Sequence, residues 1–338
     1  MGFPSSASRA TFGHHPVLPP SMPPILRALE SRNYRIYFAG QLISLAGTWM
    51  QQVAMVWLAY RLTGSALVLG VVGFASQFPI LIFSAMGGVI TDRFDKRRLL
   101  LATQALSMVQ ALGLAALAWQ GSATPAHLIA LAFGLGLINA LDVPTRQAIA
   151  VQLVDNKADL PNAIALNSFL MNAARFVGPS LAGFVVALAG EAVCFLLNGL
   201  SYLAVLLALL AIRLPAGEAR KPPAPPLQAL REGLAYAAGQ AEIRASLLLV
   251  ATTSFLAAPY VVLMPLFARE IFGGDARLYG LLLGCSGAGS LLGSAYLASR
   301  QDTTGLTRKV ALAAPAVGVC VALFALSPAL WMAVPVLR

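Results

Sequence analysis

The feature that most constrains this chain is a series of long apolar runs separated by short polar gaps. We place nine such runs at residues 34–60, 66–91, 98–119, 126–147, 163–189, 191–212, 244–268, 277–299 and 309–326. Each run holds roughly the 20 residues that a helix needs to cross about 30 Å of hydrocarbon. Only 11% of the residues are charged, whereas about 25% are charged in an ordinary soluble domain. The sequence therefore predicts an all-α polytopic membrane protein.

A tenth apolar stretch begins near Pro328 and reaches Arg338 after about eleven residues, fewer than the roughly 17 that a span requires. We therefore expect the chain to end inside a helix. The longest gap holds a Pro-rich segment followed by a stretch with amphipathic helical spacing, as a tether between two bundles would. The predicted organisation is a cytosolic tail and lead-in at 1–33, a first six-helix bundle at 34–213, a cytoplasmic linker at 214–243 and a second, incomplete bundle at 244–338.

Lysine and arginine are distributed unevenly over the gaps. Eighteen of them lie in the tail or in gaps on its side of the membrane, and three, Arg61, Arg269 and Arg277, lie on the opposite side. Because positive residues accumulate in cytoplasmic loops, we expect the amino terminus and the even-to-odd connections in the cytoplasm. The net charge of +10 is thus a topology signal and does not indicate a nucleic-acid partner.

The sequence offers little material for catalysis or metal binding. The three cysteines lie inside apolar runs, where they behave as small hydrophobic residues. His14 and His15 lie in the tail and His127 lies at the edge of the fourth run. A membrane-embedded enzyme needs convergent polar groups at membrane depth, so we expect no enzymatic activity, no metal site and no cofactor.

The most specific motif follows the second run and reads G-x-x-x-D-R-x-x-K-R, formed by Gly88, Asp92, Arg93, Lys96 and Arg97. Gly88 would allow close helix approach, Asp92 would pair near a helix end, and the basic cluster would hold the loop on the inner face. A plain cluster of positive loop charges is the alternative. The motif resembles the loop signature between helices two and three of the major facilitator superfamily. One departure is an aspartate at position 95, where the family usually has glycine.

A second motif, NAARFVGPSLAG, lies in the fifth run and includes Gly178, Pro179 and Gly183. Its small residues favour tight helix packing and its proline bends the helix; a generic kinked span is the alternative. The motif resembles the Gly-Pro motif of helix five in the exporter branch of the superfamily. Residues 32–66 and 141–168 further resemble the subgroup of enterobactin and macrolide exporters.

The resemblance implies a major facilitator fold in the bacterial inner (plasma) membrane, with a six-helix amino-terminal bundle and an incomplete second bundle. It implies a secondary active transporter, most simply a monomer in the lipid bilayer, that exports a small amphipathic compound of drug or siderophore type. Protons are the expected coupling ion and alternating access the expected mechanism. Nutrient uptake and a nonfunctional transporter fragment are the alternatives.

Charges inside the spans are the first candidates for functional residues, because burying a charge in the membrane is costly. Arg175 lies near the middle of the fifth run, where it would bind an anionic substrate group or pair structurally with an acid. The resemblance implies that Asp142 joins Asp92 and Lys96 in a network that locks the cytoplasmic gate, with proton carriage as the alternative role of Asp142.

Polar and aromatic side chains in the spans supply further candidates. In the superfamily helices one, four and seven line the substrate path, which favours Gln52 and Asn139 as lining residues, together with Arg175. Trp49 and Trp57 would either stack on a bulky substrate or pack against lipid.

Overall fold

The computed structural model describes residues 24–212, 226–298 and 306–337, and these ranges contain helices and no strand. A first group of six helices comprises α1 (Arg32–Thr63), α2 (Ala66–Arg93), α3 (Lys96–Trp119), α4 (Pro125–Gln152), α5 (Leu160–Ala189) and α6 (Glu191–Ala211). The later elements are α7 (Pro226–Gly239), α8 (Ala241–Leu266), the π-helical turn η3 (Phe267–Ile271), α9 (Ala276–Ala298), α10 (Leu306–Ala325) and α11 (Leu330–Leu337).

Eight of these helices are long and apolar enough to cross a membrane, which confirms the predicted all-α membrane fold. They coincide with the first eight predicted runs, and α10 occupies the ninth. The amphipathic part of the predicted linker forms α7, whereas its Pro-rich part and the tail residues 1–23 lie outside the described residues.

Local chemistry fixes where several helices begin. The hydroxyl of Thr124 accepts a hydrogen bond from the backbone N–H of His127 and caps α4, and Ser65 caps α2 in the same way. Gly190 lies between α5 and α6 with a φ of 83°, a left-handed conformation that favours glycine. The predicted runs 163–189 and 191–212 leave this one residue between them, and the structure confirms that two separate helices meet there.

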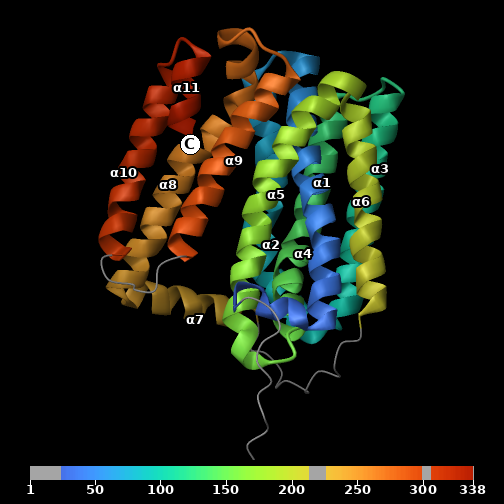
Figure 1. The fold of residues 1–338 in the computed structure, drawn as a ribbon, viewed down its shortest axis with the longest axis vertical. Helices are drawn as coiled ribbons and strands as arrows, with labels where there is room; N and C mark the ends of the chain where they lie inside the picture. The colour runs from blue at the N-terminus through green and yellow to red at the C-terminus, as the bar shows by residue number, and fades with distance from the viewer. Residues whose placement is uncertain (1–23, 213–225, 299–305, 338) are drawn as a thin grey trace, which may run out of the picture.

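The helices stand side by side in two groups (Figure 1). In the first group α2 packs on α4, and α6 packs on both α1 and α3. α8 to α11 form the second group, and α7 lies across the end at which α1 begins, here called the lower end. The two groups meet chiefly where α5 packs along α9.

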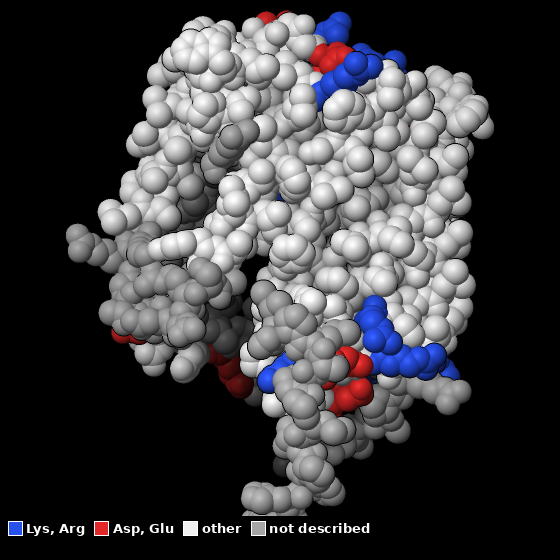
Figure 2. Space-filling view, viewed as in Figure 1, with Lys and Arg blue, Asp and Glu red and all other residues white. Residues whose placement is uncertain are grey.

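The surface has the polarity expected of a protein in lipid. Figure 2 shows charged side chains gathered at the upper and lower ends, with a broad uncharged belt between them. Large apolar side chains such as Leu81 and Phe255 are about four-fifths exposed, which is unusual for a soluble surface. In the same view a hollow separates the two groups over the lower half of the molecule.

Candidate functional site

The basic loop at the lower end caps α3 and links it to α6. The carboxylate of Asp95 accepts a hydrogen bond of 2.7 Å from the backbone N–H of Arg98 and so caps α3. Arg97 donates from Nε to the carbonyl of Leu209 (2.7 Å) and from Nη2 to that of Leu210 (2.8 Å). These carbonyls belong to the last turn of α6, where a positive charge is favourable. The departure at Asp95 therefore supplies a helix cap to the loop.

The glycine that brings α2 close to α4 is Gly87, and the expectation for Gly88 was wrong. A Cβ added to Gly87 would lie only 2.0 Å from the carbonyl oxygen of Ala140, whereas one added to Gly88 would meet nothing within 4 Å. The sequence signal was present as a pair of glycines, but the partner helix decides which of the two faces it.

Asp142 is buried and 3% exposed. Its Oδ1 accepts hydrogen bonds from Thr103 (2.8 Å) and Gln104 (2.7 Å) of α3, and its Oδ2 lies 3.7 Å from Nε of Arg146. The structure thus shows Asp142 linking α4 to α3 through polar contacts inside the first group. Since a buried carboxylate needs such partners, Asp142 has a clear structural role.

The other members of the predicted network lie at helix ends: Asp92 in the last turn of α2 and Lys96 at the start of α3. Asp92 is exposed, as is the neighbouring Arg93, and Lys96 is half-buried. The contacts seen at Asp142 come from Thr103, Gln104 and Arg146, and we had not singled out any of these three as a functional residue. Thr103 and Gln104 are two polar residues within the apolar run 98–119, and nothing in the sequence shows which side of the helix they face.

The motif of α5 joins that helix to both groups. A Cβ on Gly178 would lie 2.5 Å from Cβ of Trp49 on α1, and one on Gly183 would lie 2.7 Å from the carbonyl oxygen of Ala276 on α9. From the other side, a Cβ on Gly280 would lie 2.6 Å from the carbonyl oxygen of Pro179. The α5–α9 seam is therefore a contact between backbones, made possible by glycines on both helices.

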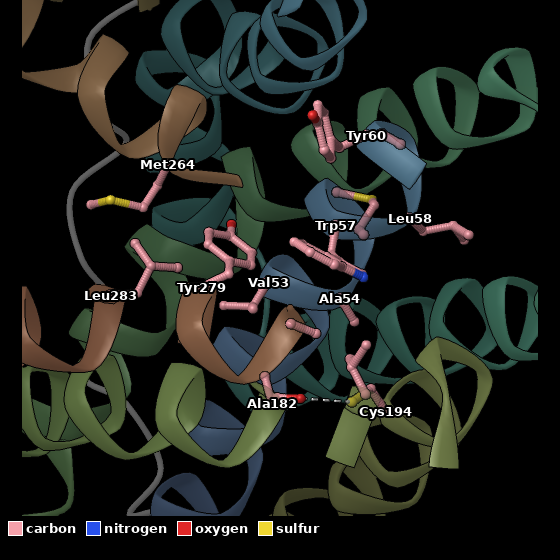
Figure 3. Close-up of a cluster of buried hydrophobic side chains, with 14 of the residues drawn as sticks. Val53, Ala54, Trp57, Leu58, Tyr60, Ala182, Cys194, Met264, Tyr279 and Leu283 are labelled. Carbon is pink, nitrogen blue, oxygen red and sulfur yellow. Dashed lines mark hydrogen bonds between the residues drawn. The ribbon is translucent and has the colours of Figure 1, made fainter. Parts of the chain in front are cut away.

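An apolar plug closes the upper part of the boundary between the groups. The rings of Trp57 on α1 and Tyr279 on α9 stack with centroids 5.8 Å apart and an interplanar angle of 20°. Val53, Ala182, Met264 and Leu283 pack in the same buried cluster (Figure 3). Trp57 is 6% exposed, so its ring packs inside the protein in this conformation and does not lie on the lipid-facing surface.

A polar contact crosses the boundary just above the plug. The hydroxyl of Tyr60 on α1 donates to Oε1 of Glu270 in η3 at 2.5 Å. Close by, Arg61 forms an ion pair with Glu191 of α6, with Nε and Oε1 2.9 Å apart. The first contact ties the two groups together, and the second fastens α1 within its own group.

Arg175 is exposed, and its guanidinium carbon lies 4.9 Å from the centroid of the Trp49 ring, in cation–π geometry. Neither of the two ion pairs described above, Arg61–Glu191 and Arg146–Asp142, involves Arg175. The acid partner envisaged for Arg175 is therefore not found among the described residues. Trp49 is half-buried and lies beside this cation.

The remaining path candidates differ in exposure. Gln52 is exposed and Asn139 is half-buried. The neighbouring Gln51, in contrast, is buried and joins Gln110 of α3 (2.8 Å) and Asn198 of α6 (2.7 Å) by hydrogen bonds. That network satisfies polar groups inside the first group of helices and leaves Gln52 as the more accessible of the two glutamines.

Comparisons with known proteins agree with this arrangement. Residues 25–338 match the model of a family described as transmembrane secretion effector. The chain is 28% identical over 269 residues to the staphyloferrin A transporter of Staphylococcus aureus, covering 78% of this chain and 66% of that one. It is 26% identical over 185 residues to the multidrug efflux pump Tap of Mycobacterium tuberculosis, covering 54% and 44%. It is also 23% identical over 254 residues to macrolide efflux protein A of Streptococcus pyogenes, covering 72% and 61%.

A solved structure shares the fold. It is the crystal structure of a bacterial homologue of the human lysosomal transporter Spinster, in an inward-facing and unoccupied conformation, with a TM-score of 0.65 and 15% sequence identity. The alignment covers 90% of this chain and 71% of that chain. The chain spans about two thirds or less of the length of the curated relatives described above.

Proposed function

Since the chain belongs to the transmembrane secretion effector family of major facilitator transporters, we propose that it is a secondary active exporter that works by alternating access. The observation that carries the proposal is the asymmetry of the boundary between the two groups of helices. The plug around Trp57 and Tyr279 closes its upper part, and a hollow opens toward the lower end (Figure 2). One closed and one open end are what a carrier requires in one of its two states.

The orientation follows from the loop charges. The tail, the basic loop with Arg97 and the linker side carry most of the lysine and arginine, which supports placing the lower end in the cytoplasm of a bacterial cell. The hollow would then open inward. Export requires that the cargo enter from this side, so the conformation is the loading state.

The cargo we propose is a small amphipathic compound, and the driving force we propose is the proton gradient. Support for export comes from the relatives, one a siderophore transporter and two efflux pumps by name. The helices on either side of the hollow are largely apolar, which suits a cargo that is itself largely apolar. Neither a cofactor nor a second subunit enters the proposal.

Opening the upper end would require breaking the contact between Tyr60 and Glu270. A carboxylate that accepts a hydrogen bond across the boundary is a place where proton binding would weaken the contact. Proton uptake from the outer side would in this way favour release, which is the sequence of events that proton-driven export needs.

Expression in a bacterial strain that lacks its own efflux pumps tests the proposal. We expect lower accumulation of fluorescent amphipathic dyes and higher resistance to macrolides than in cells with an empty vector, both lost when an uncoupler collapses the proton gradient. A variant with Trp57→Arg, which places a charge in the plug, is the inactive control. Dye accumulation above the empty-vector level would indicate uptake, and no change across a broad panel would overturn transport of such compounds.

A further inference from the structure

Arg175 lies on the α5–α9 seam, near its lower end. A Cβ on Gly287 of α9 would lie 2.7 Å from the carbonyl oxygen of Arg175, so the two backbones touch there. The other glycine contacts of the seam, at Gly280 and Gly183, lie closer to the upper end.

The faces of α5 place Arg175 on the side of the helix opposite the one expected to meet lipid. At 3.6 residues per turn, Gly178 and Ala174 lie on the side that packs on α1, and Gly183 lies on the side that packs on α9. Arg175 falls between these two sides. The opposite side carries exposed apolar residues, the surface expected to meet lipid: Val177, Leu181, Phe184 and Leu188.

Exposure along the Arg175 side of α5 changes at this residue. Toward the lower end Ile164, Ser168 and Met171 are exposed, and toward the upper end Pro179 and Ala182 are buried. Arg175 is the charged residue at this transition.

The charge of Arg175 has no counter-ion among the described residues. The ring of Trp49 lies over one face of the guanidinium, and among the described residues none accepts a hydrogen bond from its N–H groups. A guanidinium binds carboxylates through two parallel hydrogen bonds, and these strengthen as water leaves the site. We propose that Arg175 is the recognition site for an anionic group of the cargo, foremost a carboxylate, with Trp49 beside it for an apolar or aromatic part of the same molecule.

This inference rests on the proposed function and narrows the cargo to amphipathic anions. It also implies that the lower end closes only when an anion is bound at Arg175. If the lower end closed over an empty site, Arg175 would lose its water and stay unpaired, which is unfavourable at membrane depth. Closing over a carboxylate replaces that water with an ion pair, so the empty carrier is held open until an anion is loaded.

The test uses two probes of nearly equal shape, 1-naphthylacetate and its neutral amide. Binding to the detergent-solubilised chain is measured by equilibrium dialysis for wild type, R175Q, R175K and R277Q, the last being an exposed arginine at the upper end of α9. We expect wild type and R277Q to bind the carboxylate at least tenfold more tightly than the amide. R175Q should abolish this preference, and R175K should keep part of it because it keeps the charge.

Equal binding of both probes by wild type, or an undiminished preference in R175Q, would overturn the anion site. A second measurement, export of both probes from cells, separates the two proposals. Arg175-dependent binding without export would refute the exporter and leave the anion site standing. Export of neutral dyes, together with equal binding of the carboxylate and the amide, would refute the anion site and leave the exporter standing.

Discussion

A single methyl group should distinguish Gly87 from Gly88. In Gly87→Ala the new Cβ would lie 2.0 Å from the carbonyl oxygen of Ala140, whereas non-bonded heavy atoms prefer separations of about 3.5–4.0 Å. α2 and α4 must therefore move apart by more than about 1 Å along one of the most extensive contacts of the first group. Overpacking of this kind typically costs about 1–3 kcal/mol. We expect G87A to lower the free energy of unfolding by that amount.

Gly88→Ala is the matched control because it makes the same chemical change one residue along the same helix. Its Cβ would meet nothing within 4 Å, and exchanging glycine for alanine inside a helix stabilises by about 0.5–1 kcal/mol. Thermal unfolding in detergent, followed by tryptophan fluorescence, should place the variants on opposite sides of wild type. If G88A melts as early as G87A, or if G87A melts with wild type, the close approach of α2 and α4 is not as described.

Three further predictions concern the contacts that hold the loop, the seam and the upper end. Asp95→Ala should destabilise by about 0.5–2 kcal/mol through loss of the α3 cap, while Asp95→Ser retains most of that stability in the same melting assay. Gly280→Ala, with a Cβ 2.6 Å from a backbone oxygen of α5, should reduce export several-fold at equal expression, whereas Gly293→Ala should leave it unchanged; equal export by both variants would refute a tight seam. Tyr60→Phe removes the hydrogen bond to Glu270. Pulsed electron paramagnetic resonance between spin labels on the α3–α4 turn and on the first turn of α9 should then show a larger population with long distances across the upper end. An unchanged distance distribution would mean that this hydrogen bond does not hold the upper end closed.

The helices were predictable from sequence because lipid imposes a strong and simple pattern. A span must be apolar over about 20 residues regardless of its neighbours, and the eight confirmed spans show that pattern without tertiary information. Gly190 was likewise predictable, since a single uninterrupted helix through α5 and α6 would be far longer than a bilayer requires.

Partners across helices were less predictable. Gly87 and Gly88 are equivalent in sequence, and only the position of α4 makes one of them essential. Trp57 is an aromatic residue in a span whether it meets lipid, cargo or Tyr279, and its role depends on a residue more than 200 positions away. The contacts of Asp142 depend in the same way on the rotation of α3 about its axis, which a pattern with few charges leaves open.

In the proposed transport cycle, the glycine seam between α5 and α9 would also affect how fast the two groups of helices move against each other. Helices that interlock through large side chains must lift ridges out of grooves and move side chains between rotamers when they rotate against each other. The backbone surfaces at Gly183, Gly280 and Gly287 carry no such side chains, so rotation about this seam would need little rearrangement. The barrier to the proposed motion would then lie in the contacts at the two ends, and substitutions there should alter the turnover rate.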